Sequence, residues 1–203
     1  MTDLQAAPRT SAATSPRERI LDTALLLMAD QGAGSTSMRQ LAKACDLNVA
    51  GIYHYFPSKA DLLRSVIEER QYELKLREMP DVRLDLPPRE LLVGLVVEIW
   101  RGARDEEQVW RLLLGEGLHG DETAVAVGGE LLAAIEAGLD EWLRRLFPDR
   151  AEVTPAIVDL ITTQLFGSFI DQLFRPDHGE ADVRARAERI AALVFPDEPV
   201  PPA

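Results

Sequence analysis

Residues 37–59 hold side chains whose types and spacing suit contact with a nucleic acid. Lys59 begins a predicted helix, where the helix macrodipole disfavours a cation unless an anion binds nearby, so it suggests a phosphate contact. Asn48 and Gly51 weaken a helix that packing alone would strengthen, and they suit a backbone that comes close to a phosphate. The Tyr53 hydroxyl can reach a phosphate oxygen. The segment is therefore a candidate nucleic-acid surface.

The outward side of this segment is identified by the apolar residues that must face inward. Ile52 and Phe56 lie one helical turn apart, so they share a buried face. Val49 and His54 are then exposed, and Val49 and Gly51 are predicted to read base edges. The full set of predicted DNA contacts is Ser37, Arg39, Asn48, Val49, Ala50, Gly51, Tyr53, His54 and Lys59.

Two short helices joined by a tight turn must position these residues. Ser37 and Gln40 have the spacing of a capping box, and Asn48 can cap a second helix after the turn. Pro57 cannot continue that helix, and residues 58–61 provide the start of the next one. This pattern is typical of a helix-turn-helix. A plain packing hairpin with its aromatic side chains in the core is the structural alternative.

Residues 52–59, Ile-Tyr-His-Tyr-Phe-Pro-Ser-Lys, resemble the Leu-Tyr-x-His-Phe-x-x-Lys run of the tetracycline-repressor (TetR) family of transcriptional regulators. Tyr55 replaces the usual His, and Cys45-Asp46-Leu47 replaces the usual Ala-Gly-Val of the turn. The glycine of that turn has a left-handed backbone, which Asp tolerates better than most residues. The match covers roughly residues 16 to 62. It implies an all-α protein with an N-terminal three-helix DNA-binding domain and a larger C-terminal ligand-binding and dimerisation domain.

The net charge differs between the predicted DNA-binding part of the chain and the rest. The net charge is −12, but residues 1–59 hold 6 Lys or Arg against 5 Asp or Glu, whereas residues 60–203 hold 16 against 29. The first part is nearly neutral, and the acidity of the rest would keep it off DNA. Cys45 is the single cysteine, so an internal disulfide is excluded, and it is expected to be a small buried hydrophobe. With no apolar run long enough to span a membrane, we expect a cytoplasmic protein.

Helix signals set the predicted boundaries. Residues 1–14 are expected to be a disordered tail, 15–60 the helix-turn-helix domain, 61–197 the ligand-binding and dimerisation domain, and 198–203 a C-terminal tail. Ser15 begins the first helix with Pro16 and Glu18 behind it, and Ile20, Ala24, Leu27 and Met28 form its predicted buried stripe. The fourth helix is predicted from Lys59 to about Met79, as a connector between the domains, followed by a proline-broken link to Pro88.

The helix after Pro155 is apolar nearly all the way round, so it must be covered on two sides. One side can be its own core and the other a second subunit, with the last helix beside it. The resemblance also implies this homodimer. The predicted interface residues are Leu165, Phe169, Leu173, Ile190 and Val194.

The larger domain offers candidates for a small-molecule site. The predicted lining residues are Trp100, Trp110, Leu113, Glu116, Gln164, Phe166 and Ile170. Glu98, Glu116 and Asp171 interrupt apolar faces, and a buried carboxylate needs a partner, which Arg111, Arg144 or a cationic ligand could supply. No cofactor is expected. His119 and His178 would make a poor metal site, so no metal site is expected either.

The sequence lacks a glycine-rich phosphate loop, a Gly-x-Ser-x-Gly motif and a His-Glu-x-x-His motif, so an enzyme is not expected. The favoured hypothesis is a ligand-responsive homodimeric repressor of a palindromic operator, read by the helix that begins at Asn48 and released by a small molecule. The alternatives are an all-helical enzyme and a helix-turn-helix protein regulated by protein partners without a small-molecule ligand.

Overall fold

A computed structural model describes residues 15–68 and 78–197, and in this part of the chain the regular structure is entirely helical. The helices are α1 Pro16–Gln31, α2 Met38–Ala44, α3 Val49–Tyr55, α4 Lys59–Glu68, α6 Pro88–Asp105, α7 Glu107–Leu118, α8 Glu122–Leu146, the short 3₁₀ turn η1 Pro148–Arg150, α9 Thr154–Phe174 and α10 Glu180–Val194. The predicted all-α class is confirmed.

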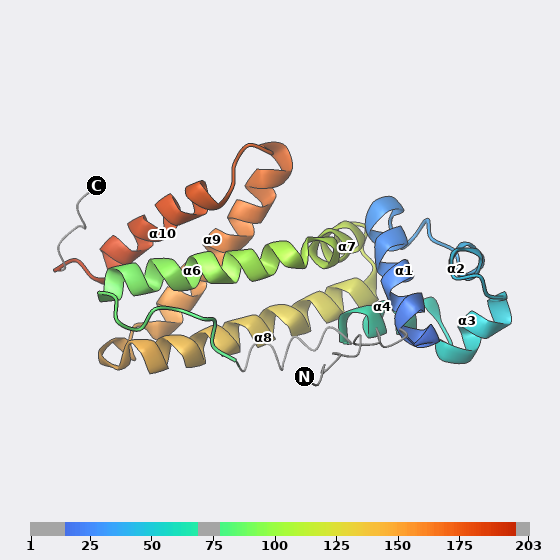
Figure 1. Cartoon of the computed structure of the whole chain (residues 1–203), viewed down its shortest axis with the longest axis horizontal. Coiled ribbons are helices and arrows are strands. Elements are labelled where there is room, and N and C mark those ends of the chain that lie inside the picture. Colours follow the sequence, from blue (N-terminus) through green and yellow to red (C-terminus); the bar gives the residue numbers. More distant parts are fainter. Residues whose placement is uncertain (1–14, 69–77, 198–203) are drawn as a thin grey trace, which may run out of the picture.

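The molecule is elongated, with α1 to α4 at one end and α6, α9 and α10 at the other (Figure 1). The long helix α8 runs along the body toward α4, and α7 lies between the end of α6 and α1. The larger body therefore reaches the N-terminal helices through two elements, α7 and α8.

Helix α1 begins as its sequence predicts. The Ser15 side chain accepts a hydrogen bond from the Glu18 N–H, the Glu18 carboxylate accepts one from the Ser15 N–H, and Pro16 occupies the first turn. The predicted buried stripe was partly wrong, because Leu27 is only half-buried while Leu21 and Leu25 are buried. The α1 stripe is wider than expected since α4 and α7 both pack on it.

One apolar cluster crosses the boundary predicted at residue 60. It joins the buried faces of α1 to α4 to Leu112 of α7 and to Val127 and Leu131 of α8. A second cluster fills the space among α6, α8, α9 and α10, and includes Leu95, Leu139 and Ile161, together with Ala187 of α10. The half-buried Trp110 packs against both clusters.

Several predictions lie outside the described residues. The continuation of the fourth helix through residues 69–77 belongs here, as do the tails at 1–14 and 198–203. Residues 78–87 lead into α6 without regular helix, as the proline-broken link predicted. None of the helices that the structure describes is both long and apolar enough to cross a lipid bilayer.

Candidate nucleic-acid interface and ligand cavity

Helices α2 and α3 are held at a fixed angle by a tight turn. The Ser37 hydroxyl accepts a hydrogen bond from the Gln40 N–H at 3.1 Å, which completes the predicted capping box. At the other end of α2, Asp46 has φ 55°, and the Leu47 N–H donates to the Ala42 carbonyl at 2.8 Å. This is a Schellman ending with Asp at the left-handed position, as the sequence predicts for an Asp that replaces glycine.

The second helix, α3, begins at the predicted cap. The Asn48 side-chain oxygen accepts a hydrogen bond from the Gly51 N–H at 2.6 Å. A Cβ added to Gly51 would lie 3.3 Å from that same oxygen. Gly51 therefore has a local reason to be glycine, namely room for the cap, in addition to the close approach of DNA that the sequence suggested.

The outward face of α3 carries the polar and aromatic residues. Tyr53, His54 and Tyr55 are exposed, whereas Ile52 and Phe56 are buried as predicted. The other predicted contacts Ser37, Arg39, Asn48 and Ala50 are also exposed. The prediction that Val49 is exposed was wrong, because this side chain is half-buried and packs against the N-terminal core.

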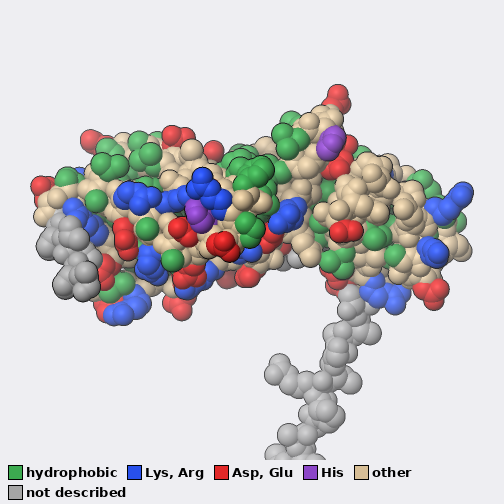
Figure 2. All heavy atoms as spheres, turned by 90° about the horizontal axis from the view of Figure 1, so that it is seen from above, with side chains coloured by type: hydrophobic (Ala, Val, Ile, Leu, Met, Phe, Trp, Pro, Cys, Tyr) green, Lys and Arg blue, Asp and Glu red, His purple; other side chains and the backbone are tan. Residues whose placement is uncertain are grey.

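Lys59 has a partner within the protein. Its ammonium group donates a hydrogen bond to the Gly34 carbonyl at 3.3 Å, and the side chain is half-buried. The helix macrodipole argument for a phosphate is therefore weaker than the sequence suggested, since this carbonyl already offsets part of the charge. In Figure 2, Lys and Arg side chains project from the α1 to α4 end of the molecule, at the right of the view.

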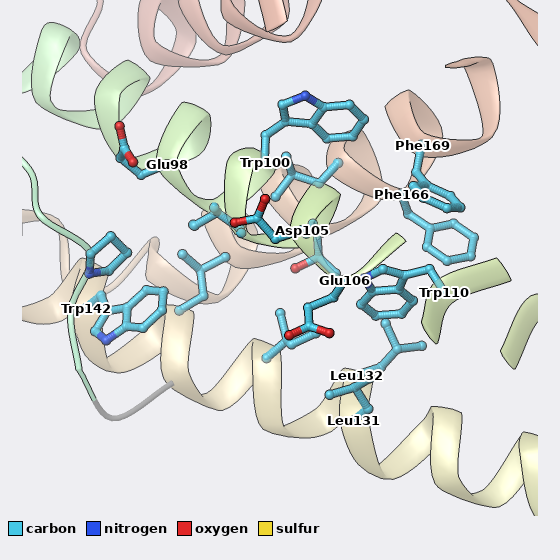
Figure 3. A pocket seen from close by; sticks show the side chains of 18 of the residues that line it. Glu98, Trp100, Asp105, Glu106, Trp110, Leu131, Leu132, Trp142, Phe166 and Phe169 are labelled. Atoms are coloured by element: carbon cyan, nitrogen blue, oxygen red, sulfur yellow. The ribbon is translucent and has the colours of Figure 1, made fainter. Parts of the chain in front are cut away.

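A cavity of about 530 Å³ lies among α6, α7, α8 and α9, between the two apolar clusters (Figure 3). Its walls are mostly aromatic and aliphatic. The aromatic lining residues are Trp100, Trp110, Trp142, Phe166 and Phe169. A mostly apolar cavity of this size with a few polar groups is typical of a small-molecule site.

The cavity gathers some of the predicted ligand residues and leaves out others. Trp100, Trp110 and Phe166 line it, and Glu98 does so as well. The predicted lining residues Leu113, Glu116, Gln164 and Ile170 do not line it. Leu113 belongs to the N-terminal core, and Ile170 packs on the second core. Helical period alone could not show which face of α7 or α9 borders the cavity.

Trp142 and Thr162 also line the cavity and were missed as ligand residues. The Trp142 side chain is 5 % exposed, yet its indole N–H has no hydrogen-bond partner, and the Thr162 hydroxyl has none either. A buried polar atom without a partner is costly and needs an explanation. Trp142 lies on the buried face of α8, where core and cavity-lining residues follow the same helical period, so the sequence could not distinguish the two roles.

Glu116 joins α7 to the turn that follows α1. The residue is 8 % exposed, and its carboxylate accepts hydrogen bonds from the N–H groups of Ala33 at 2.7 Å and Gly34 at 3.2 Å. Gly32 has φ 84°, a backbone conformation that favours glycine, and a Cβ added there would lie 3.3 Å from the Glu116 carboxylate. The sequence correctly indicated that this carboxylate needs a partner, but the partner is the turn after α1.

The family model for the bacterial regulatory proteins of the tetR family matches residues 20–66. This range contains α2, its turn and α3, the elements with the helix-turn-helix geometry. The N-terminal helices are those of a tetR-family transcriptional regulator. The family suggested by residues 52–59 is thereby confirmed.

Relatives support this assignment at two levels. The chain is 29 % identical over 104 residues, half of each chain, to the HTH-type transcriptional regulator YttP of Bacillus subtilis, so it spans about half the length of that relative. It is 28 % identical over 198 residues to the HTH-type regulator Rv1255c of Mycobacterium tuberculosis, covering 96 % of this chain and 92 % of that one. These relatives are transcriptional regulators and not enzymes.

The fold matches that of solved tetR-family structures. A regulator from Mesorhizobium loti aligns over 92 % of this chain and 98 % of its own, with a TM-score of 0.72 and 14 % identity. At that identity the similarity concerns the fold alone. It includes the helical body that the N-terminal family model does not reach.

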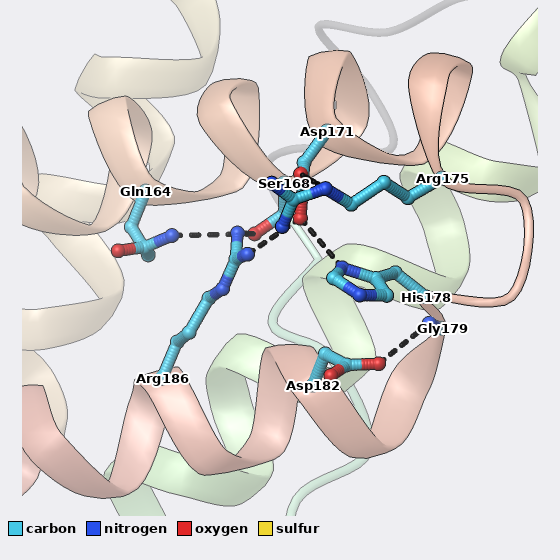
Figure 4. Close-up of polar contacts among 8 residues, drawn as sticks. All are labelled: Gln164, Ser168, Asp171, Arg175, His178, Gly179, Asp182 and Arg186. Atoms are coloured by element: carbon cyan, nitrogen blue, oxygen red, sulfur yellow. Dashed lines mark hydrogen bonds and ion pairs between the residues drawn. The ribbon is translucent and has the colours of Figure 1, made fainter.

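The partners of the Asp171 carboxylate lie in a polar cluster at α9 and α10 (Figure 4). Its carboxylate lies 2.7 Å from His178 Nδ1 and 2.6 Å from the Arg186 guanidinium. These hydrogen bonds, that of His178 first, hold the pKa of Asp171 below its ordinary value. The two predicted arginine partners were wrong, because Arg111 pairs with Glu107 and Arg144 with Asp140 on their own helices.

His119 and His178 lie apart from any metal-binding geometry. His119 Nδ1 lies 2.7 Å from the Gly115 carbonyl, and His178 belongs to the Asp171 cluster. Among the residues that the structure describes, no three His, Cys, Asp or Glu side chains are grouped as metal ligands.

The predicted dimer-interface residues do not share one exposed face. Phe169 and Ile190 are 6 % and 7 % exposed within a single chain, so their side chains already belong to the core of the protomer and offer little surface to a partner. Leu165 and Val194 are half-buried, and Leu173 is exposed. Of the predicted residues only Leu173 belongs to the exposed apolar surface of these helices, whose other members are Leu160, Phe166, Phe174 and Leu193.

Proposed function

We propose that this tetR-family protein is a transcriptional repressor that binds a palindromic operator as a homodimer and is released by a small molecule. The observation that carries the proposal is α3, a capped helix fixed by the Asp46 turn, whose exposed face bears Tyr53 and His54. In a helix-turn-helix, the second helix enters the major groove and meets base edges with its N-terminal residues.

Contacts to DNA divide into positioning and reading. Arg39, Tyr53 and Lys59 supply a cation or a hydroxyl that can meet phosphate oxygens. His54 and the exposed Ala50 supply a ring nitrogen and a methyl group that can meet base edges. The half-buried Val49 contributes to this reading mainly by fixing α3 on its own domain.

The cavity supports the response to a small molecule. It borders the C-terminal end of α6 and the first turn of α7, which carries Trp110. Two turns further along α7, Glu116 holds the N–H groups of Ala33 and Gly34. A ligand that displaces Trp110 would shift α7, and the carboxylate would carry this shift to the turn between α1 and α2.

A second route leads through α8, which lines the cavity with Leu131 and packs against α4. The fourth helix is the element that the sequence predicted as the connector between the domains. Through α7 and α8 together, a movement of the cavity walls would reach the N-terminal domain at both α1 and α4. A rigid-body tilt of this domain in each subunit would change the distance between the two α3 helices.

The exposed apolar side chains of α9 and α10 support the homodimer. Phe174 is 82 % exposed and Leu193 is 75 % exposed, with Leu173 beside Phe174. Soluble monomers rarely leave a contiguous apolar patch of more than a few hundred Å² in water. Pairing of these helices with their symmetry mates would place the N-terminal domains at the two ends of one dimer.

Selection of binding sites from random duplex DNA tests the proposal. We expect an enriched palindrome whose half-sites are one helical turn or more apart, and a complex with two chains per site. A Tyr53→Phe variant should select the same palindrome with weaker binding, because it loses only a hydroxyl. Failure to enrich any sequence, or enrichment of a single half-site by one chain, would contradict the proposal.

A further inference from the structure

The cavity carries charge of one sign. Its described charged lining residues are Glu78, Glu98, Asp105 and Glu106, and no Lys, Arg or His belongs to the described lining. In Figure 3 the Asp105 and Glu106 carboxylates appear between the Trp142 and Trp110 indoles. An anionic ligand would meet like charge here, whereas a cation would meet carboxylates and aromatic faces together.

The C-terminal end of α6 adds to the negative electrostatic potential in the cavity. Gly102, Ala103 and Asp105 line the cavity in the last turn of the helix, where the macrodipole is negative. The exposed Asp105 side chain forms no hydrogen bond or ion pair with another described residue, and the neighbouring Arg104 is bound to Glu107 at 2.6 Å. An acidic side chain at a helix C-terminus is locally unfavourable, and a bound cation would remove this conflict.

The arginine closest in sequence to Glu98 is already shared. Arg101 pairs with Glu98 and also with Glu180 of α10 through two hydrogen bonds of 2.7 and 2.8 Å. One guanidinium thus faces two carboxylates, and the three side chains together keep a net negative charge. Arg101 fixes α6 to α10 and leaves the cavity acidic.

Two buried polar atoms of residues that line the cavity lack hydrogen-bond partners. The Trp142 indole nitrogen can only donate, and the Thr162 hydroxyl can donate or accept. Both residues line the cavity, and Trp142 is itself almost completely buried. A ligand with an oxygen or nitrogen acceptor would satisfy the indole N–H, and this observation is independent of the acidic residues.

We propose that the cavity takes an aromatic organic cation that also carries a hydrogen-bond acceptor. The aromatic rings stack on the tryptophan and phenylalanine walls, the acidic residues at the α6 to α7 junction select the charge, and Trp142 binds the acceptor. The inference deepens the proposed function, because it takes the cavity as the effector site.

A pair of fluorescent probes with one shape and opposite charge tests the selection. Rhodamine 123 is a cationic xanthene methyl ester, and fluorescein methyl ester has the same frame and the same ester carbonyl but is an anion at pH 8. Binding is measured by fluorescence polarisation on the full chain without DNA. We expect rhodamine 123 to bind at least about tenfold more tightly, an effect of the size that one nearby charge produces.

Two variants locate the effect. Asp105→Asn should lower the affinity for rhodamine 123 about fivefold and leave or raise that for the anion, because only a carboxylate charge is removed. Asp159→Asn is the matched control, since Asp159 is exposed on α9 away from the cavity lining. Trp142→Phe keeps an aromatic ring but loses the N–H, so it should weaken both probes about equally.

Equal or tighter binding of the anion would overturn the inference, as would a failure of both probes to bind up to their solubility limit. If rhodamine 123 binds as expected but the protein selects no DNA, the ligand class stands and the proposed regulatory function fails. If DNA is selected and only the anion releases it, the regulatory function stands and this inference fails.

Discussion

Replacing Glu116 should loosen the turn between α1 and α2. Its carboxylate accepts two backbone hydrogen bonds, one of 2.7 Å from the buried Ala33 N–H and one of 3.2 Å from the Gly34 N–H. Hydrogen bonds to a charged group contribute about 1.5–3 kcal/mol when buried, and the longer, half-exposed one contributes less. Glu116→Ala removes both and leaves a buried donor unpaired, so we expect a loss of about 2–4 kcal/mol in the free energy of unfolding.

A loss of this size would not unfold a domain whose stability is about 5–15 kcal/mol. For a chain of about 200 residues it should lower Tm by about 5–12 °C. Glu116→Gln retains one acceptor oxygen of the same shape, so its effect should be about half as large. Gln108→Ala is the control, because Gln108 is exposed on the same helix.

Calorimetry measures the Tm, and amide hydrogen exchange locates the loosened segment. We expect faster exchange at residues 33–36 in Glu116→Ala, with little change in α9. A melting temperature within about 1 °C of the parent together with unchanged exchange at this turn would refute the reasoning, because a buried two-donor contact cannot be lost without cost. Loss of ligand-induced DNA release in Glu116→Gln, with ligand binding retained, would further place this carboxylate on the coupling route.

Three further predictions concern DNA, assembly and pH. Lys59→Ala should weaken operator and non-operator DNA alike and lower the salt slope by about one unit per subunit, whereas an unchanged slope in titrations would exclude a phosphate contact. Leu173→Glu puts a charge on the exposed apolar surface of α9, so light scattering should give a mass near 22.5 kDa instead of about twice that value, and an unchanged mass would place the interface elsewhere. Because the pKa of Asp171 is lowered in the folded state by His178 and Arg186, its stabilising effect is present above its unfolded pKa of about 3.9 and is lost as the pH falls through the lower folded value. Acid unfolding should therefore show the stability gap between the parent and Asp171→Asn shrinking below about pH 4, and a gap that stays constant there would contradict the assignment.

Structural features that depend only on residues close together in the sequence could be predicted. The Ser37 to Gln40 box and the Asn48 cap each join residues that are three positions apart, and a left-handed Asp46 follows from the turn itself. The position of the helix-turn-helix was predictable for this reason. The buried faces of Ile52 and Phe56 follow from a single helical period.

Features made by distant residues could not be predicted in the same way. Glu116 contacts a turn more than eighty residues earlier, and nothing in its own helix indicates that partner. Phe169 and Leu173 lie four residues apart on α9, yet one is buried against its own protomer and the other is exposed. A helix that is apolar on every side has no hydrophobic period that identifies its inner face. The sequence therefore could not show which residues of α9 line the cavity and which are exposed to a partner.

The cluster that joins α1 to α4 with α7 and α8 limits how freely this protein can be recombined. Because Leu112, Val127 and Leu131 complete the core under the N-terminal helices, a fragment ending at residue 68 would expose that core to water. The DNA-reading end is therefore not an interchangeable module. A chimera that gives this body the reading end of a relative would need matching substitutions on α7 and on the first half of α8, and evolution of a new operator preference is easier on the surface of α3 than by exchange of the whole domain.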